Sequence, residues 1–156
     1  MEEVKVKLKV LGLTNSQIQA GAYALVLAEE GLRRLPVVVG MFEAQSIAIA
    51  IEGIKPPRPL THDLIIAIIR STGMEVAEVF IYKYEESVFF SEIVLTDGTK
   101  LFHLDSRTSD AIAIALRAEC VIYTTESIME ECGVVMDEPG QRDESEEIYD
   151  EISFED

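Results

Sequence analysis

The chain has 156 residues, of which 48% are apolar, and its formal net charge at pH 7 is −16. This length and apolar content suit one domain around a single core, so two domains are not expected. No apolar run approaches the roughly 18 to 20 residues of a membrane-spanning helix, and the N-terminus does not have the pattern of a signal peptide. The two cysteines, Cys120 and Cys132, stand in neither CxxC spacing nor a His-rich segment, so no disulfide framework and no zinc site are predicted. We expect a soluble, cytoplasmic protein that binds no membrane.

The negative charge is concentrated at the C-terminal end. Residues 137–156 hold ten acidic residues and one arginine, so they carry −9 of the −16. A segment of this composition cannot bury enough apolar surface to fold, and we expect a partly disordered acidic tail after a folded domain at 1–136. A tail that mimics nucleic acid or occludes a basic site is the alternative. The rest of the chain is also acidic, so a bound polyanion must meet a local basic cluster or metal ions.

The first half of the chain predicts three strands followed by two helices. Residues 4–10 alternate apolar side chains with lysines, which is the pattern of a half-buried strand with a lysine-lined outer face. We interpret these lysines as a solvated face or as protection of a sheet edge, not as a binding patch. The other elements predicted here are strands within 20–31 and at 35–40, and helices at 43–52 and 61–73 that stop at Gly53 and Gly73.

The second half is rich in strands. Residues 75–106 alternate well, and Asp97-Gly98 between apolar runs is a strong hairpin signal. A third helix at 107–119, a strand at 120–125 and a short helix at 126–133 follow. Strands and helices come in blocks instead of strict alternation. We therefore expect an α+β fold: a single compact domain with a mixed or antiparallel sheet and three to four short helices.

Three of the predicted helices lack a wide polar face. Ala and Ile alternate densely in 46–51 and 110–116, and 64–69 has no polar position. Such helices need cover on more than one side, and in a chain this small another subunit can supply part of it. Homo-oligomerisation is therefore a hypothesis, which a mass in solution equal to one chain would remove.

Polar residues that solubility does not explain gather at three predicted helix starts. The first is Glu43, which also fits simple charge placement at a helix N-terminus. The second is the segment KPPRPLTHDL itself, whose prolines impose an extended path, hold Arg58 outward and lead to Thr61 as a helix cap. His62 and Asp63 then lie in the first turn, where neighbours diverge by roughly 100° and cannot form a side-by-side dyad. A surface or capping role is the alternative to a functional one for His62.

The third cluster is HLDSRTSD, at the junction of a strand and the third helix. We expect the strand to break at Asp105, Arg107 to follow, and Thr108 or Ser109 to cap a helix with Asp110 in its first turn. A carboxylate at a strand end and another at the next helix start can aim two oxygen ligands at a hard cation such as Mg²⁺. An ordinary cap with an Asp–Arg ion pair explains the same residues.

Common catalytic signatures are missing from the sequence. It contains no GxxxxGK[ST], GxSxG or HExxH motif and no glycine triplet that opens a helix after a strand. The aromatic residues lie in predicted strands, and we interpret them as core instead of a base-stacking platform. Lysine or arginine beside exposed rings would reopen that question.

Four linked segments resemble the bifunctional nuclease (BFN) domain family in order and spacing. They are LPVVVGMFEAQSIAIAIEG, PPRPLTHDLI, VFFSEIVLTDG and LDSRTSDAIAIALR, and the resemblance covers about residues 4–135. It implies a compact α+β domain that forms a homodimer and acts as a nuclease on RNA and DNA, with nucleic acid as its partner. The polar positions of the family's motifs correspond here to Glu43, Arg58, Pro59, Thr61, His62, Asp63, Asp105, Arg107, Ser109 and Asp110.

For a nuclease, these residues predict phosphodiester hydrolysis assisted by Mg²⁺ or Mn²⁺, which would offset phosphate charge and activate water. Arg58 and Arg107 would stabilise the transferring phosphoryl group, and His62 would act as general acid or base. The predicted catalytic residues are His62, Asp63, Asp105 and Asp110, the predicted substrate-binding residues are Arg58, Arg107 and Ser109, and the predicted metal ligands are Glu43, Asp105 and Asp110.

Two other functions fit the same residues. In a non-catalytic dimeric module, the arginines would pair with the aspartates to fix the helix starts and the dimer. In a small-anion or nucleotide sensor, helix N-termini and the arginines would bind the anion. Carboxylates that converge in an open cleft beside unpaired arginines would favour the enzyme, and closed Arg–carboxylate pairs would favour the structural module.

Overall fold

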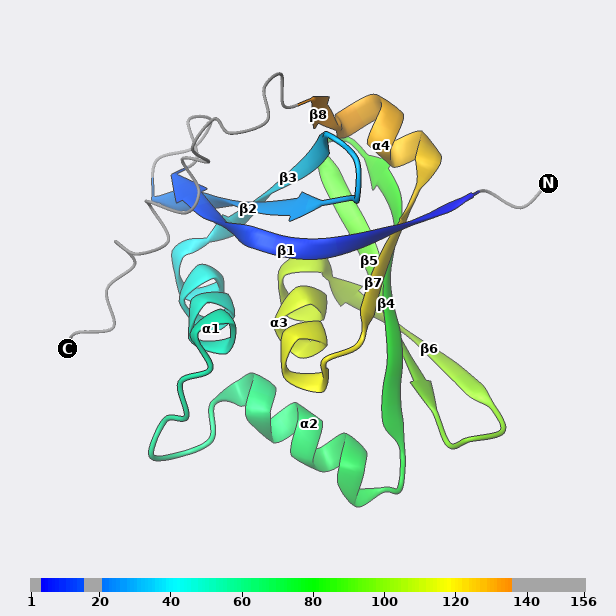
Figure 1. Ribbon diagram of the computed structural model, residues 1–156. Coiled ribbons are helices and arrows are strands. Elements are labelled where there is room, and N and C mark those ends of the chain that lie inside the picture. The colour runs from blue at the N-terminus through cyan, green and yellow to red at the C-terminus, as the bar shows by residue number, and fades with distance from the viewer. Residues whose placement is uncertain (1–3, 16–20, 136–156) are drawn as a thin grey trace.

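The protein is a strongly curved sheet that wraps around one helix (Figure 1). The structure is a computed structural model, and it describes residues 4–15 and 21–135. The predicted acidic tail at 137–156 lies outside these residues, so its separation from a domain at 1–136 stays a prediction. Within the described ranges, every helix is too short or too polar to cross a membrane.

The described residues form one eight-stranded mixed sheet with helices on its concave side, which confirms the predicted α+β class. Two antiparallel meanders, β1-β2-β3 and β4-β5-β6, are joined through β7, which is antiparallel to β1 and parallel to β4. The order across the sheet is β6-β5-β4-β7-β1-β2-β3-β8. The strands are β1 (Lys5–Asn15), β2 (Ala22–Ala28), β3 (Arg33–Gly40), β4 (Glu75–Glu85), β5 (Val88–Thr96), β6 (Leu101–Arg107), β7 (Val121–Thr125) and β8 (Val134–Val135).

Helix α3 lies at the centre of the core. It packs against α1, α2 and the sheet, and Figure 1 shows the sheet curving around it. Its central residues Ile112, Ala113 and Ile114 are completely buried. The chain's own elements therefore supply the all-round cover that the apolar sequence of this helix requires. The helices are α1 (Met41–Glu52), α2 (Thr61–Ser71), α3 (Thr108–Ala118) and α4 (Glu126–Cys132).

The predicted caps of two helices were wrong. Helix α2 has Leu60, not Thr61, at its N-cap, because Asp63 accepts a hydrogen bond from the backbone N–H of Leu60 at 2.9 Å and starts the helix there. Helix α3 has Arg107 at its N-cap, in place of the predicted Thr108 or Ser109. The hydroxyl of Thr108 is instead hydrogen-bonded to Ser91 at 2.6 Å, so it joins the helix to β5.

The predicted break of a strand at Asp105 was also wrong. Strand β6 pairs with β5 from Leu101 through Arg107, and Asp105 lies opposite Glu92 in this ladder. Both carboxylates face the convex side of the sheet, since the neighbouring Ser91 points inward to α3 and successive side chains alternate between faces. A solvated outer face tolerates a carboxylate in a strand, so the polar residue alone does not end it.

Strand β1 is an interior strand of the sheet. It pairs with β7 from Lys5 to Leu8 and with β2 from Lys9 to Asn15. Lys5, Lys7 and Lys9 are exposed while Leu8 is buried, as the alternating pattern predicts. The two-residue strand β8, which pairs with Arg33 and Arg34 of β3, was not predicted.

The core of α3 gives a stability prediction. Ile114→Ala removes completely buried methyl groups and leaves a cavity, so the free energy of unfolding should fall by about 2–5 kcal/mol. Ile54→Ala, at a position 43% exposed, should change it by less than about 0.5 kcal/mol. Urea unfolding of both variants followed by circular dichroism checks this, and equal losses would contradict the central place of α3.

Candidate functional site

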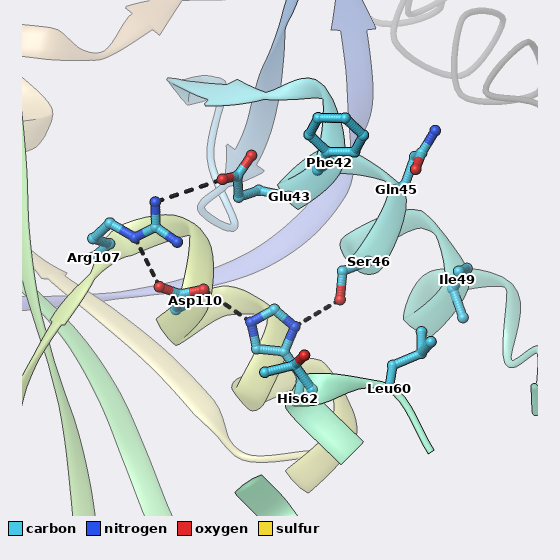
Figure 2. Close-up of a pocket in the computed structure, with 10 residues that line it drawn as sticks. Phe42, Glu43, Gln45, Ser46, Ile49, Leu60, His62, Arg107 and Asp110 are labelled. Atoms are coloured by element: carbon cyan, nitrogen blue, oxygen red, sulfur yellow. Dashed lines mark hydrogen bonds and ion pairs between the residues drawn. The ribbon is translucent and has the colours of Figure 1, made fainter. Parts of the chain in front are cut away.

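The first turns of three helices meet around one open cavity of about 410 Å³ (Figure 2). Its lining residues come from the start and outer face of α1, from the start of α2, and from the junction of β6 and α3. They are Phe42, Glu43, Gln45, Ser46, Ile49, Leu60, Thr61, His62, Arg107 and Asp110. The three predicted clusters of polar residues at helix starts thus come together in a single site.

His62 is the most deeply placed titratable group of this cavity, with 8% of its surface exposed. It shares the buried face of α2 with Ile66 and Ile69, four and seven residues further on, and this spacing turns the ring inward. Its Nε2 lies 2.9 Å from Asp110 Oδ1 and its Nδ1 lies 2.7 Å from Ser46 Oγ. Figure 2 shows the ring held between α3 and α1 by these two contacts.

The Asp110 carboxylate determines the hydrogen-bond directions around the neutral His62 ring. An ionised carboxylate only accepts, so His62 Nε2 carries the proton and donates it to Asp110. His62 Nδ1 is then the acceptor, and the Ser46 hydroxyl donates to it. Ser46 Oγ also accepts a hydrogen bond from Arg117 Nη2 at 3.2 Å.

Arg107 closes the other side of the cavity. Its Nε donates to Asp110 Oδ2 at 2.9 Å, and its Nη1 lies 3.5 Å from Glu43 Oε1, while 67% of its side chain stays exposed. Gly40 makes room for this arrangement, because the Glu43 carboxylate occupies the space that a side chain on Gly40 would need. The arginine is thus fixed at one edge and open to solvent at the other.

The Asp110 carboxylate is kept ionised by its partners. Burial acts to raise the pKa of Asp110, but the hydrogen bonds from Arg107 and His62 outweigh it and hold the pKa below its ordinary value. The same contact with Asp110 raises the pKa of the Arg107 guanidinium. Asp110 is therefore a permanent anion near neutral pH, and it can stabilise a positive charge on His62.

Asp63 lies outside the cavity lining and points away from His62, as the helical spacing predicts. Its Oδ1 accepts from Arg117 Nε at 2.8 Å, and Arg117 also donates to the Ser46 carbonyl at 3.2 Å. The Arg117 side chain is only 9% exposed, so this ion pair ties α2 and α1 to α3 from inside. In this structure Asp63 braces the helices around the site.

The remaining predicted residues lie elsewhere. Asp105 is on the convex face of the sheet, 3.4 Å from the Tyr82 hydroxyl, and it does not approach Asp110. Arg58 is exposed in the proline segment, outside the cavity lining. Ser109 lines a neighbouring cavity on the other side of Arg107.

The three predicted metal ligands do not converge. Glu43 and Asp110 share the cavity, but Arg107 binds both, and Asp105 faces the opposite side of the sheet. In residues 4–15 and 21–135, no three His, Cys, Asp or Glu side chains are grouped closely enough to hold a metal ion together. As arranged here, the carboxylates do not fit the predicted metal centre.

Sequence reasoning missed Ser46 and Arg117. Each is a polar residue inside a dense Ala-Ile helix, and such an interruption is the signal that could have identified it. A buried arginine requires partners, so Arg117 in the last turn of α3 predicts contacts with polar groups on neighbouring helices. Ser46 and Asp63 are those partners.

Residues 25–137 match the model of the bifunctional nuclease domain. The chain belongs to the bifunctional nuclease domain family, which confirms the resemblance seen in its four motifs.

Two similar proteins come from Mycobacterium tuberculosis. They are the uncharacterized protein MT1877 of strain CDC 1551 / Oshkosh and the uncharacterized protein Rv1829 of strain ATCC 25618 / H37Rv. Each is 35% identical over 138 residues, which cover 88% of this chain and 81% of the relative. The similarity thus extends over nearly the whole chain.

The ion pair between Asp63 and Arg117 predicts a stability effect that depends on pH. Asp63→Asn leaves the buried guanidinium of Arg117 without its counter-charge and should lower the free energy of unfolding by about 3 kcal/mol at pH 7. Glu75→Gln, which breaks the exposed Arg70–Glu75 pair at 3.4 Å, should cost less than about 0.5 kcal/mol.

Burial acts to raise the pKa of Asp63, but the bonds from Leu60 and Arg117 prevail and lower it. Because the folded-state pKa is the lower one, the stabilisation is complete above the unfolded pKa of about 3.9 and is lost as the pH falls through the folded value. The stabilities of wild type and Asp63→Asn, measured by urea unfolding from pH 7 to pH 2, should therefore converge in acid. A difference that is independent of pH would contradict the ion-pair explanation.

Proposed function

We propose that this protein hydrolyses phosphodiester bonds of RNA or DNA in the cavity around His62. The proposal rests on one observation: three helix N-termini meet at a single cavity. The same cavity holds His62, which is hydrogen-bonded to Asp110, and Arg107, which pairs with Asp110 but stays largely exposed. Membership of the bifunctional nuclease domain family supports nuclease-like function and nucleic acid as the partner. The hydrolytic activity itself is the proposal.

The backbone at the cavity suits a phosphate group. Helices α1, α2 and α3 each begin there, and the side chains of their N-cap residues, Gly40, Leu60 and Arg107, make no capping hydrogen bond. First-turn N–H groups and the positive ends of the helix dipoles favour an anion at such a point. Arg107 adds a fixed positive charge that can bind two oxygens of one phosphate.

The proposed chemistry uses the chain of hydrogen bonds through His62. Ser46 lines the cavity and its hydroxyl lies 2.7 Å from His62 Nδ1, so a proton leaving an attacking water passes by way of Ser46 to the ring. Asp110 stabilises the resulting imidazolium, which then returns the proton to the departing alkoxide. Arg107 stabilises the negative charge that builds up on the phosphoryl oxygens.

The divalent cation stays a prediction. Glu43 and Asp110 exceed the charge of Arg107 by one negative unit, so Mg²⁺ or Mn²⁺ would help to admit a phosphate. No step of the proposed mechanism depends on such an ion, because the three predicted ligands do not meet. Cleavage compared in Mg²⁺, in Mn²⁺ and in EDTA decides this question.

Nuclease activity is tested with purified protein and labelled single-stranded RNA and DNA. His62→Gln should lower the cleavage rate by about 10²- to 10⁴-fold, because it removes the group that exchanges the proton. Asp110→Asn should lower it by at least about 100-fold, whereas Asp105→Asn, on the convex face, should leave it intact. Arg70→Ala at the exposed end of α2 serves as the control for a lost surface charge.

If Asp105→Asn and Asp110→Asn lowered the cleavage rate equally, the result would support the arrangement predicted from the sequence, in which both aspartates are catalytic. Cleavage that survives in His62→Gln would show a contaminating nuclease or a different site.

A non-catalytic module is the second candidate. It is favoured by the closed pairs Arg107–Asp110 and Arg117–Asp63, which are the arrangement expected of a structural network. Wild-type protein that neither cuts nucleic acid nor binds a nucleotide or inorganic phosphate would support this module. Binding of a nucleotide or phosphate without cleavage would support the small-anion sensor instead.

The proposed homodimer gives a separate prediction. Leu64 and Ile68, one turn apart on the outward face of α2, are 54% and 55% exposed and can pack against a second copy. Light scattering at micromolar concentration should give twice the 17.4 kDa of one chain, and Ile68→Asp should reduce it to one. A mass of 17.4 kDa for the wild type would show a monomer and contradict the dimer hypothesis.

A further inference from the structure

We propose that a second cavity, next to the one around His62, binds the base of a nucleotide adjoining the scissile phosphate, so that the substrate is a single strand. This inference rests on the proposed nuclease function. The polar motif residues pointed to only one end of this cavity, at Glu43, Arg107 and Ser109, because its other walls are mostly apolar.

The second cavity adjoins the first through Arg107 and Glu43, which line both. Its volume is about 860 Å³, within the range of about 300–1,000 Å³ typical of small-molecule sites. It lies between β3 and the turn that connects β4 to β5, with the end of α4 beyond. A phosphate at Arg107 therefore has a neighbouring space into which its nucleotide can extend.

The walls of this cavity suit a flat aromatic ligand. Tyr84 and Phe89 stand opposite each other across the β4–β5 ladder with ring centroids 4.6 Å apart and planes tilted by 48°. Pro36, Val37 and Val39 of β3 add apolar surface to the same wall. Stacking on aromatic rings and apolar contact are how proteins hold unpaired bases.

The cavity also offers polar groups for the base edge. Beyond Arg33 and Arg34, where β8 pairs with it, the outer edge of β3 has no strand partner in the described part of the chain, so alternate backbone groups of this edge face the cavity. Ser109 lines the cavity near Arg107. Glu131 lines it beside the Pro36 end of β3, and a carboxylate there accepts hydrogen bonds from the amino group of a base.

The charges run in the order that a nucleotide requires. Arg107 marks the end shared with the first cavity, where the phosphate would lie, and Glu131 marks the far end. The four-residue step from Pro36 to Gly40 along β3 spans roughly 13 Å, which is sufficient for a sugar and a base.

A single strand fits this arrangement better than a duplex. Bases inside a duplex are stacked and paired, and one of them reaches a separate pocket only if it is flipped out. Bases of a single strand can splay apart and enter without that cost.

The test compares two substrates. Bis-p-nitrophenyl phosphate needs only the cavity at His62, whereas a labelled single-stranded oligonucleotide also uses the second cavity. Phe89→Ala should lower kcat/KM for the oligonucleotide by about 10- to 100-fold, and so should Glu131→Trp, which replaces the exposed carboxylate at the far end of the cavity by a bulky ring. Both should leave hydrolysis of the small diester within about twofold of wild type.

Phe80→Ala on the convex face of the same sheet is the matched control, and it should change neither rate. Thermal unfolding verifies that each variant is folded. Glu131→Trp keeps the test decisive if Phe89→Ala unfolds, because Glu131 is exposed.

Direct binding gives a readout that does not require catalysis. A single-stranded oligonucleotide carrying thiouridine should crosslink to Tyr84 or Phe89 on illumination, and Glu131→Trp should reduce that crosslink. Wild-type kcat/KM for the oligonucleotide in both cavity variants, or crosslinks confined to the convex face, would overturn the inference while leaving the proposed function standing. Hydrolysis of neither substrate by wild type, together with a crosslink in the second cavity, would instead contradict the proposed function alone.

Discussion

The apolar contact between α3 and the concave face of the sheet fixes the positions of the three helix starts that surround the cavity at His62. Ile112 and Ile114 have no exposed surface, so the helix cannot shift or rotate without opening the core. Helices α1 and α2 both pack on α3, and Arg117 near its end binds groups on each of them. The separation between His62 on α2 and Asp110 on α3 therefore follows from core packing. The cavity around His62 is held in shape because the helices that line it are all attached to one buried helix, α3.

Electrostatics in this acidic protein are handled locally. Around this cavity, the positive ends of three helices and Arg107 offset the charges of Glu43 and Asp110. On the convex face, Lys5 Nζ lies 4.6 Å from the centre of the Phe80 ring and 5.2 Å from that of Tyr123, and it also pairs with Glu78. Lysine beside aromatic rings had been the condition for reconsidering a base-stacking platform. Here the Lys5 ammonium group itself lies over the faces of both rings, where a base would have to stack. We therefore interpret these contacts as packing between neighbouring strands of the sheet.

Hydrophobic periodicity was sufficient to predict the helices, most of the strands and the α+β class, because burial on a face leaves a direct pattern in the sequence. The two-residue strand β8 is too short to leave such a pattern. The clustering of polar residues at helix starts likewise pointed to Glu43, His62, Arg107 and Asp110, which the structure brings together. The placement of Asp105 could not be predicted. Whether a strand ends at a polar residue or continues through it depends on the register with β5, which is a tertiary property.

The roles of Asp63 and Ser46 were hidden for a related reason. Both depend on Arg117, which lies 54 residues from Asp63 and 71 from Ser46 in the chain. No local rule connects positions so far apart. The helix spacing did show that Asp63 and His62 point in different directions, but only the packing of α3 shows which of the two faces the cavity.

Strand β7 has a consequence for how the molecule is assembled. The two meanders contain only neighbouring strands and can form from local contacts, but β7 joins them by pairing with β1 and β4 at once. Its residue Tyr123 is partnered with Lys7, more than a hundred positions earlier, so loop closure must precede any gain from that pairing. During synthesis, the sheet remains in two halves until residues 121–125 have left the ribosome. Until then the backbone N–H and C=O groups along these edges of β1 and β4 lack their partners in β7, and open strand edges favour association with other chains.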